Sequence, residues 1–164
     1  MTTVVNFPRR TMRDWSTYVD PDKAIWIAIG EPGHAHMSYD AVRNPFLDDL
    51  PNLHINFWDL TVPVPAIGGD DKEIFLYPPN EKDAKTIVDF ILAHKNKHVF
   101  VNCRAGKSRS AAVAQFCMEL LGYEWTGDGR RIAVPNTTLF KLMKEYYLSF
   151  NPEPVKVIDK RRKF

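Results

Sequence analysis

The stretch Val99-Phe100-Val101-Asn102-Cys103-Arg104-Ala105-Gly106-Lys107-Ser108-Arg109-Ser110 decides the fold that we expect for this chain. Its apolar, partly β-branched start predicts a buried strand that ends at Cys103. A short loop follows, in which Gly106 lets the backbone approach a ligand closely. The apolar run over residues 111–121 then predicts a helix that Gly122 closes. Strand, loop and helix in this order are typical of an α/β domain.

The segments on either side of this stretch alternate between strand and helix patterns. Short apolar runs predict strands, and apolar residues at helical spacing predict amphipathic helices. The predicted strands are residues 3–7 at a sheet edge, the buried run 24–29 and residues 53–58. The predicted helices are residues 9–18, a helix capped by Asn80 that runs to about His94, and a last helix that begins at Asn136. We therefore expect one α/β domain over residues 1–164, with a largely parallel central sheet flanked by helices.

The loop after Cys103 brings a thiol and cations to the start of a helix. The positive end of the helix dipole favours the nucleophilic thiolate of Cys103 near neutral pH. The N–H groups of the loop can ring a tetrahedral anion, and the planar fork of Arg109 can hold two of its oxygens. The residues that we expect to bind this anion are Arg104, Ala105, Gly106, Lys107, Ser108 and Arg109. The sequence thus predicts a phosphate-binding loop that carries its own nucleophile.

A buried cysteine beside an incidental arginine is the simpler alternative for this stretch. Lys107 makes that alternative less attractive, because three cations within six positions need an anion or solvent around them. The second cysteine, Cys117, falls on the apolar side of the predicted helix, and we assign it to the core.

The stretch resembles the signature loop of cysteine-dependent protein tyrosine phosphatases, particularly of the dual-specificity branch. In that family His-Cys is followed by five residues, by Arg, and by Ser or Thr. The resemblance implies that Cys103 is the nucleophile and that the hydroxyl of Ser110 assists departure of the thiolate. Asn102 stands where the family usually has a histidine that helps hold the loop. Asparagine can donate and accept hydrogen bonds but carries no charge, and we interpret Asn102 as a tuning substitution.

A phosphatase of this kind also needs a general acid for the leaving oxygen. Asp59, at the end of the predicted strand 53–58, resembles the proton donor of the family's mobile acid loop. Its separation from Cys103 is longer than the family pattern, and an insertion around residues 63–72 would account for the excess. Asp70 and Asp71 do lie at the family's distance, but Gly-Gly-Asp-Asp is also ordinary turn chemistry. We favour Asp59, because its position at a strand end matters more than a residue count.

Asn136 lies in a stretch similar to the Pro-Asn segment that opens the last helix of dual-specificity phosphatases. In that family the asparagine helps fix the phosphate loop through hydrogen bonds of its side chain. Asn136 is also a good N-cap for the last helix on local grounds, and both roles can hold together.

Composition and termini limit the remaining possibilities. The 164-residue length suits one domain with a substantial core, and no apolar run reaches membrane-spanning length. Residues 1–6 lack the features of a signal peptide, and two cysteines make no disulfide framework, so we expect a cytoplasmic, reducing location. We expect no metal and no cofactor. His34 and His36 lack cysteine or carboxylate partners at ligand spacing, and a solvated loop is the better interpretation for them.

The substrate is less constrained by the sequence. The resemblance favours a phosphoprotein, with phosphotyrosine and also phosphoserine or phosphothreonine as targets. Arg104 and Lys107 add charge to the loop as in phosphoinositide phosphatases of this superfamily, and an RNA 5′-triphosphatase is a further possibility. The basic tail from about residue 153 could contact acidic lipid, RNA or acidic protein, or be a solvated end. A phosphate-binding module with little turnover is the alternative from another class, made conceivable by Asn102.

Overall fold

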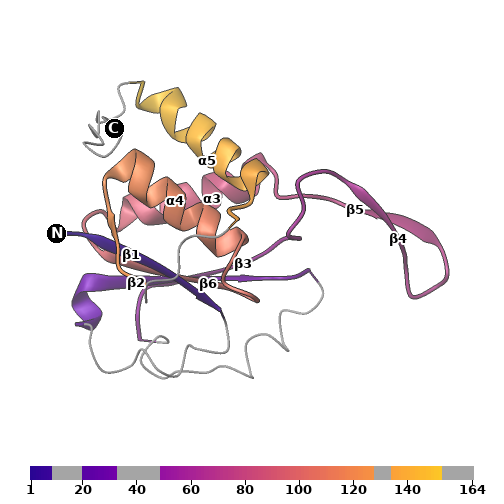
Figure 1. Cartoon of the computed structure of the whole chain (residues 1–164), viewed down its shortest axis with the longest axis horizontal. Helices are drawn as coiled ribbons and strands as arrows, with labels where there is room; N and C mark the ends of the chain where they lie inside the picture. The colour runs from indigo at the N-terminus through magenta and orange to yellow at the C-terminus, as the bar shows by residue number, and fades with distance from the viewer. Residues whose placement is uncertain (9–19, 33–48, 128–133, 153–164) are drawn as a thin grey trace.

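A five-stranded sheet forms the centre of the computed structural model, which describes residues 1–8, 20–32, 49–127 and 134–152 (Figure 1). The strand order is β3-β2-β6-β1-β7, and every pairing is parallel. The strands of this sheet are β1 (Thr3–Pro8), β2 (Ala24–Gly30), β3 (Asn52–Asn56), β6 (His98–Cys103) and β7 (Glu124–Trp125). A one-turn 3₁₀ helix, η2 (Pro21–Lys23), leads into β2. The expected parallel α/β sheet is therefore confirmed.

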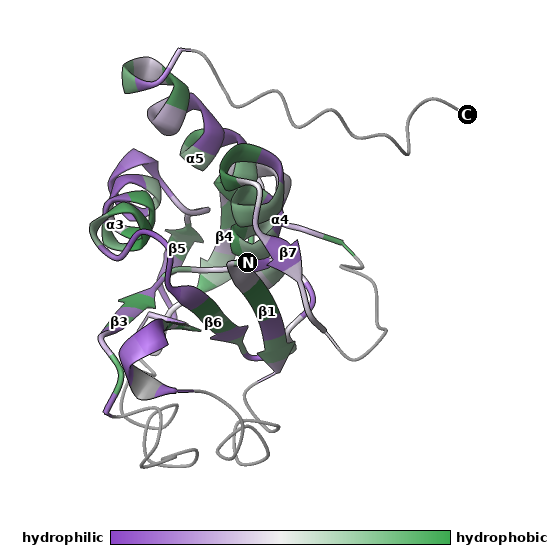
Figure 2. Ribbon diagram, turned by 90° about the vertical axis from the view of Figure 1, so that its left-hand side faces the viewer, coloured by the Kyte–Doolittle hydropathy of each residue, from purple (hydrophilic) through white to green (hydrophobic). Residues whose placement is uncertain are grey.

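Three helices lie on one face of the sheet, two of them against its strands and the third packed across those two helices (Figures 1 and 2). They are α3 (Glu81–Ala93), α4 (Arg109–Leu121) and, as the third, α5 (Thr137–Phe150). α4 lies closest to the centre, and most of its circumference is hydrophobic, as a helix packed on both sides must be (Figure 2). None of the helices in the described part of the chain is long and apolar enough to cross a membrane.

The alternation of side chains along β6 sorts its residues between two cores. Val99, Val101 and Cys103 join the large core under the helices. Phe100 packs in a smaller cluster on the opposite face of the sheet, together with Trp26. Because successive strand residues point to opposite faces, Cys103 faces the helices, whereas its predecessor in the chain faces away from them.

Local capping chemistry sets the helix ends that the sequence predicts. Asn80 forms a capping box with Asp83 at the start of α3, each side chain accepting the other residue's backbone N–H at 2.9 Å. Gly122 closes α4 in the left-handed conformation, with φ 72°. The predicted helices from Asn80 and over residues 111–121 are both confirmed.

One strand position is wrong in the sequence-based prediction. β1 does not lie at the edge of the sheet, because β7 pairs with its start through Thr3↔Glu124 and Val4↔Trp125. A two-residue strand leaves no readable pattern in a sequence, so the outer neighbour of β1 could not be foreseen. The predicted helix over residues 9–18, His34, His36 and the basic tail from residue 153 lie outside the described residues.

A β-hairpin projects from the body of the molecule (Figure 1). It consists of β4 (Val64–Ile67) and β5 (Glu73–Leu76), paired antiparallel in a separate two-stranded sheet. We refer to residues 62–77 as the arm. The arm begins three residues after Asp59 and contains the region that the sequence predicts as an insertion.

Candidate active site

The loop between β6 and α4 joins a cysteine to a helix start. Cys103 is the last residue of β6 and only 2% exposed, and Arg109 is the first residue of α4. The Sγ of Cys103 lies 3.2 Å from the Oγ of Ser110, within hydrogen-bond distance. Burial raises the pKa of the other thiol, Cys117, which keeps it protonated and unreactive in the core. The structure thus brings together the thiol and the hydroxyl that the sequence predicts as partners.

The end of β1 supports this loop from one side. Gly106 has φ 68°, and a Cβ there would lie 2.3 Å from the backbone nitrogen of Pro8 and 2.5 Å from the carbonyl carbon of Phe7. Asn6 donates a hydrogen bond from Nδ2 to the carbonyl of Gly106 at 2.9 Å, and its Oδ1 accepts one from Nε1 of Trp125 at 2.8 Å. Only glycine fits this close approach of two backbones, so the sequence of the loop and its shape are linked.

Arg109 is anchored by the carboxyl ends of the two neighbouring strands. Its Nη1 donates to the carbonyls of Gly30 at 3.1 Å and Phe57 at 2.9 Å, and its Nη2 donates to Glu31 at 2.8 Å. The side chain is 5% exposed. Its Nε is buried and has no hydrogen-bond partner among the described residues. A buried guanidinium N–H without an acceptor is costly, and an oxygen of a bound anion would satisfy it.

Asp59 lies against the loop between Cys103 and Arg109, although it is distant from that loop in sequence. Its Oδ1 accepts hydrogen bonds from the Oγ of Ser108 at 2.7 Å and from Nδ2 of Asn136 at 2.9 Å. Ser108 is the N-cap of α4, but its hydroxyl makes no cap bond to the helix and serves Asp59 instead. Both hydrogen bonds use Oδ1, so the other carboxylate oxygen, Oδ2, takes part in neither of them.

The side chain of Asn136 caps α5 as expected, but it holds Asp59 and Leu60 rather than the loop after Cys103. Its Oδ1 accepts the N–H of Leu139 at 3.0 Å and so caps α5, as expected. Its Nδ2 donates to Oδ1 of Asp59 at 2.9 Å and to the carbonyl of Leu60 at 3.0 Å, so the side chain holds the segment that carries Asp59. The phosphate-binding loop is held by the backbone instead, through the Asn136 N–H and the carbonyl of Ser108 at 3.0 Å.

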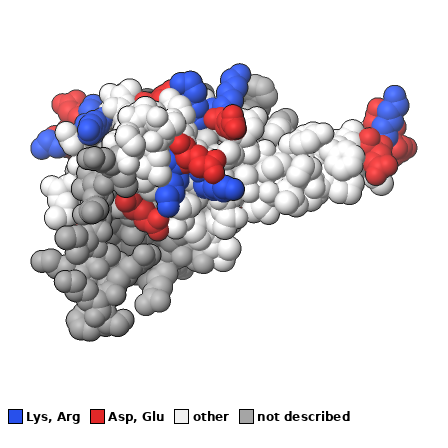
Figure 3. Space-filling view, turned by 90° about the horizontal axis from the view of Figure 1, so that it is seen from above, with Lys and Arg blue, Asp and Glu red and all other residues white. Residues whose placement is uncertain are grey.

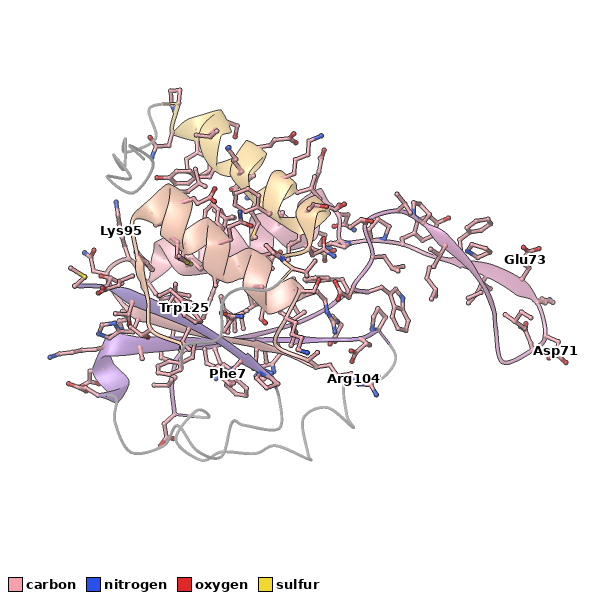
Figure 4. The ribbon with its side chains drawn as sticks, viewed as in Figure 1. Phe7, Asp71, Glu73, Lys95, Arg104 and Trp125 are labelled. Atoms are coloured by element: carbon pink, nitrogen blue, oxygen red, sulfur yellow. The ribbon has the colours of Figure 1, made fainter. Side chains whose placement is uncertain are left out.

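Asp70 and Asp71 form the turn of the arm. Asp71 has φ 60° and donates its N–H to the carbonyl of Gly68 at 3.0 Å, while Asp70 accepts the N–H of Lys72 at 3.2 Å. Figure 4 shows Asp71 at the far end of the arm, well away from Arg104 of the loop. Of the three acid candidates, only Asp59 lies beside the loop that carries Cys103.

Asn102 directly precedes Cys103 in β6, but its side chain lies away from the thiol. Its side chain is buried on the face of the sheet opposite Cys103, where Oδ1 accepts a hydrogen bond from Nε1 of Trp26 at 2.7 Å. The alternation of side chains along β6 is the physical reason, because neighbouring residues cannot share a face. Asn102 therefore fixes β6 against β2 and contributes to the site through the backbone.

Two further residues of the site were missed in the sequence. Glu31 follows β2 directly and holds Arg109, and Asn6 supports Gly106. The carboxyl ends of parallel strands meet at one edge of a sheet, so a polar residue just after the predicted strand 24–29 was a usable signal. Asn6 gave no such signal, because its partner Trp125 comes from the two-residue strand β7.

The exposed side of the loop is cationic. Arg104 and Lys107 are both exposed, as is Ala105 between them. The carbonyl of Lys107 accepts the N–H of Val134 at 3.3 Å, so the segment before α5 borders this part of the loop. The exposed side chains of Arg104 and Lys107 can contact parts of a ligand that lie outside the loop. The buried side chain of Arg109 can contact only a group that enters the loop.

Comparison with known proteins identifies the fold. No family model and no curated protein sequence matches the chain. Among solved structures it is similar to PTPMT1 in complex with PI(5)P, with 16% identity, a TM-score of 0.52, and coverage of 92% of this chain and 93% of that one. A second structure of PTPMT1 gives 15% identity, a TM-score of 0.52 and 92% coverage of both chains. The chain has the protein tyrosine phosphatase-like fold.

A human tyrosine phosphatase-like serine/threonine/tyrosine-interacting protein is similar over 79% of this chain and 80% of its own, with 20% identity and a TM-score of 0.46.

Proposed function

We propose that the chain is a cysteine-dependent phosphatase that hydrolyses phosphomonoesters through a phosphocysteine intermediate. The observation that carries the proposal is the geometry of Arg109. A buried guanidinium is fixed at both Nη atoms, and its Nε–H has no acceptor within the part of the chain that the structure describes, beside a loop that begins with a cysteine. The protein tyrosine phosphatase-like fold supports the same assignment.

The first step transfers the phosphoryl group to the enzyme. The Cys103 thiolate attacks phosphorus, the S–P bond forms, and the bond from phosphorus to the leaving oxygen breaks. Loop N–H groups and Arg109 stabilise the charge on the equatorial oxygens. Asp59 gives its proton to the leaving oxygen from Oδ2, because Oδ1 already accepts two hydrogen bonds.

The second step restores the thiolate. The Asp59 carboxylate takes a proton from water as the water oxygen attacks phosphorus and the S–P bond breaks. The electron pair of that bond returns to Cys103, and the Ser110 hydroxyl, 3.2 Å from Sγ, donates a hydrogen bond to the departing thiolate. Inorganic phosphate leaves, and Asp59 is again protonated for the next cycle.

The substrate that we favour is a phosphorylated protein, with a phosphoinositide as the second candidate. The exposed Arg104 and Lys107 support the second candidate, because an inositol headgroup with several phosphates needs cations beyond those that hold the scissile phosphate. The similar fold of PTPMT1, solved in complex with PI(5)P, supports the phosphoinositide as the second candidate.

A substrate panel in the presence of a chelator tests the proposal. Phosphopeptides, soluble phosphoinositides and 5′-triphosphate RNA are compared with the wild type, with Cys103→Ser and with the matched control Cys117→Ser. We expect release of phosphate by the wild type and the control, and a loss of at least about 10³-fold in Cys103→Ser, because the serine hydroxyl is far less acidic. Undiminished turnover in Cys103→Ser would contradict the proposal. Binding of vanadate without turnover on any substrate would favour a phosphate-binding module.

A further inference from the structure

Ser108 connects three segments that meet at the candidate active site. Its Oγ donates a hydrogen bond to Oδ1 of Asp59 at 2.7 Å, and its carbonyl accepts the N–H of Asn136 at 3.0 Å. The residue is the N-cap of α4 and directly precedes Arg109. One serine therefore joins the loop between β6 and α4 to the segment of Asp59 and to the start of α5.

The hydroxyl of Ser108 is not used as the hydroxyl of an N-cap serine usually is. A serine in this position normally accepts the N–H of the second or third helix residue, and loss of such a cap costs about 1 kcal/mol. Asn80 and Asn136 make the equivalent bond for α3 and α5, at 2.9 and 3.0 Å. Ser108 has φ −130° and ψ −73°, and its side chain makes no cap bond. The stability of α4 therefore does not explain where this hydroxyl points.

A hydroxyl in the capping position would compete with an anion bound in the loop. The first N–H groups of a helix have no partner within the helix, and the oxygens of a phosphate group can satisfy them. A capping oxygen of Ser108 would occupy one of these N–H groups. With its hydroxyl turned to Asp59, Ser108 leaves the N–H groups to the anion. One orientation of the side chain thus serves both anion binding and the hold on Asp59.

The segment of Asp59 is held by α5 as well as by the loop. Asn136 donates to Oδ1 of Asp59 at 2.9 Å, and Oγ1 of Thr138 donates to the carbonyl of Thr61 at 3.0 Å. The acidic residues of the arm, at 70, 71 and 73, belong to its far end, where Figure 3 shows charges beyond an almost uncharged stretch. Ser108 supplies the contact from the loop itself, so the direction of the Asp59 carboxyl group toward the loop depends on this hydroxyl.

We propose that Ser108 is a positioning residue for the general acid, which holds the Asp59 carboxyl group at the loop through Oδ1 and leaves Oδ2 to deliver the proton. The inference rests on the proposed function, because it assigns a role within that reaction. Ser108 acts through Asp59 and takes no part in forming or breaking a bond. Its hydroxyl matters only where the leaving oxygen needs a proton, so its loss should affect substrates with poor leaving groups.

A double-mutant cycle between Ser108 and Asp59 tests this role. The kcat values for phenyl phosphate and for p-nitrophenyl phosphate are measured for the wild type, Ser108→Ala, Asp59→Asn and the double variant. We expect Ser108→Ala to lower kcat for phenyl phosphate by about tenfold, as the loss of one hydrogen bond can, and to change kcat for p-nitrophenyl phosphate little. In the Asp59→Asn background the same substitution should have no further effect, because the acid that it positions is gone.

Two further variants separate positioning from folding. Ser108→Thr keeps the hydroxyl and should restore most of the activity that Ser108→Ala loses. Ser149→Ala is the matched control, because this hydroxyl also donates one hydrogen bond, to the carbonyl of Tyr146 at 2.6 Å, but near the last residue of α5. It should leave both kcat values unchanged. Thermal melts of all the variants show whether the fold is kept.

Three results would overturn this inference alone. They are an undiminished kcat of Ser108→Ala for phenyl phosphate, an equal loss for the two substrates, and a loss that persists in full in the Asp59→Asn background. The last two would show that Ser108 acts on the loop and not through Asp59. A wild type that hydrolyses neither substrate would overturn the proposed function together with this inference, so the two failures are distinguishable.

Discussion

At the scale of single residues, the proposed mechanism depends on the position of the Asp59 carboxylate. Its Oδ1 is held by Ser108 and Asn136, which fixes the carboxyl group beside the loop without using Oδ2. A proton donor needs such a fixed direction, because general acid catalysis depends on reach before it depends on acidity. The turn residues Asp70 and Asp71 have no comparable contact with the loop, and their hydrogen bonds are explained by the hairpin turn alone.

We predict that Asp59→Asn acts according to the leaving group. The loss should be about 10²–10⁴-fold for phenyl or alkyl phosphates and much smaller for p-nitrophenyl phosphate, because a good leaving group departs without a proton. Steady-state kcat/KM across a series of leaving groups measures the effect. Asp70→Asn and Asp71→Asn are the controls and should be nearly silent. Leaving-group dependence in either control, but not in Asp59→Asn, would move the general acid to the arm.

Two asparagine caps allow the role of Asn136 to be separated from ordinary capping. Asn80 and Asn136 each accept the N–H of the residue three positions later, at 2.9 and 3.0 Å, but only Asn136 also holds Asp59. We predict that Asn80→Ala and Asn136→Ala each lower the free energy of unfolding by about 1 kcal/mol. Only Asn136→Ala should lower kcat on substrates with poor leaving groups. Equal kcat values in the two variants would show that Asn136 only caps α5 and does not position Asp59.

At the scale of elements, the phosphate-binding loop depends on the end of β1. Gly106 approaches the backbone of Phe7 and Pro8 so closely, at φ 68°, that a side chain would push the strand and the loop apart. The loop therefore owes its shape to a strand about a hundred residues away in sequence.

We predict that Gly106→Ala destabilises the fold by about 2–4 kcal/mol and abolishes detectable turnover, because both the backbone conformation and the space exclude a methyl group. Urea denaturation measures the first effect and a phosphatase assay the second. Gly69→Ala, in the arm, is the matched control, since a Cβ there meets nothing within 4 Å. If Gly106→Ala kept full stability and activity, the end of β1 could move away from the loop without loss, and the prediction would be wrong.

The sequence predicts those elements that are defined by local patterns. The buried runs of β2 and β6, the caps at Asn80 and Gly122, and the loop from Cys103 to Arg109 could all be found in this way, because periodicity and turn chemistry are local properties. The position of β1 inside the sheet could not be found, because it depends on the two-residue strand β7. The side-chain direction of Asn102 could be predicted from the alternation along β6, whereas its partner Trp26 could not, because that residue lies on another strand.

At the scale of the whole molecule, four strand ends and two helix starts converge on one site. β1 supports Gly106, β2 and β3 supply the acceptors of Arg109, and β6 delivers Cys103. The starts of α4 and α5 meet through Ser108 and Asn136. Parallel sheets bind ligands at the carboxyl ends of their strands for this reason, since all these ends and the following helix starts lie at one edge. The arm leaves the body from the same edge, just beyond Asp59.

An attempt to trap a phosphocysteine at Cys103 tests the central claim most directly. Ser110→Ala should slow departure of the thiolate, so the intermediate should accumulate when this variant turns over p-nitrophenyl phosphate. Acid quench within the first turnovers, followed by peptide mass spectrometry, then locates the phosphoryl group. We predict one phosphoryl group on Cys103 and none on Cys117. A phosphoryl group on any other residue, or rapid turnover with no covalent intermediate in Ser110→Ala and the wild type, would contradict the account.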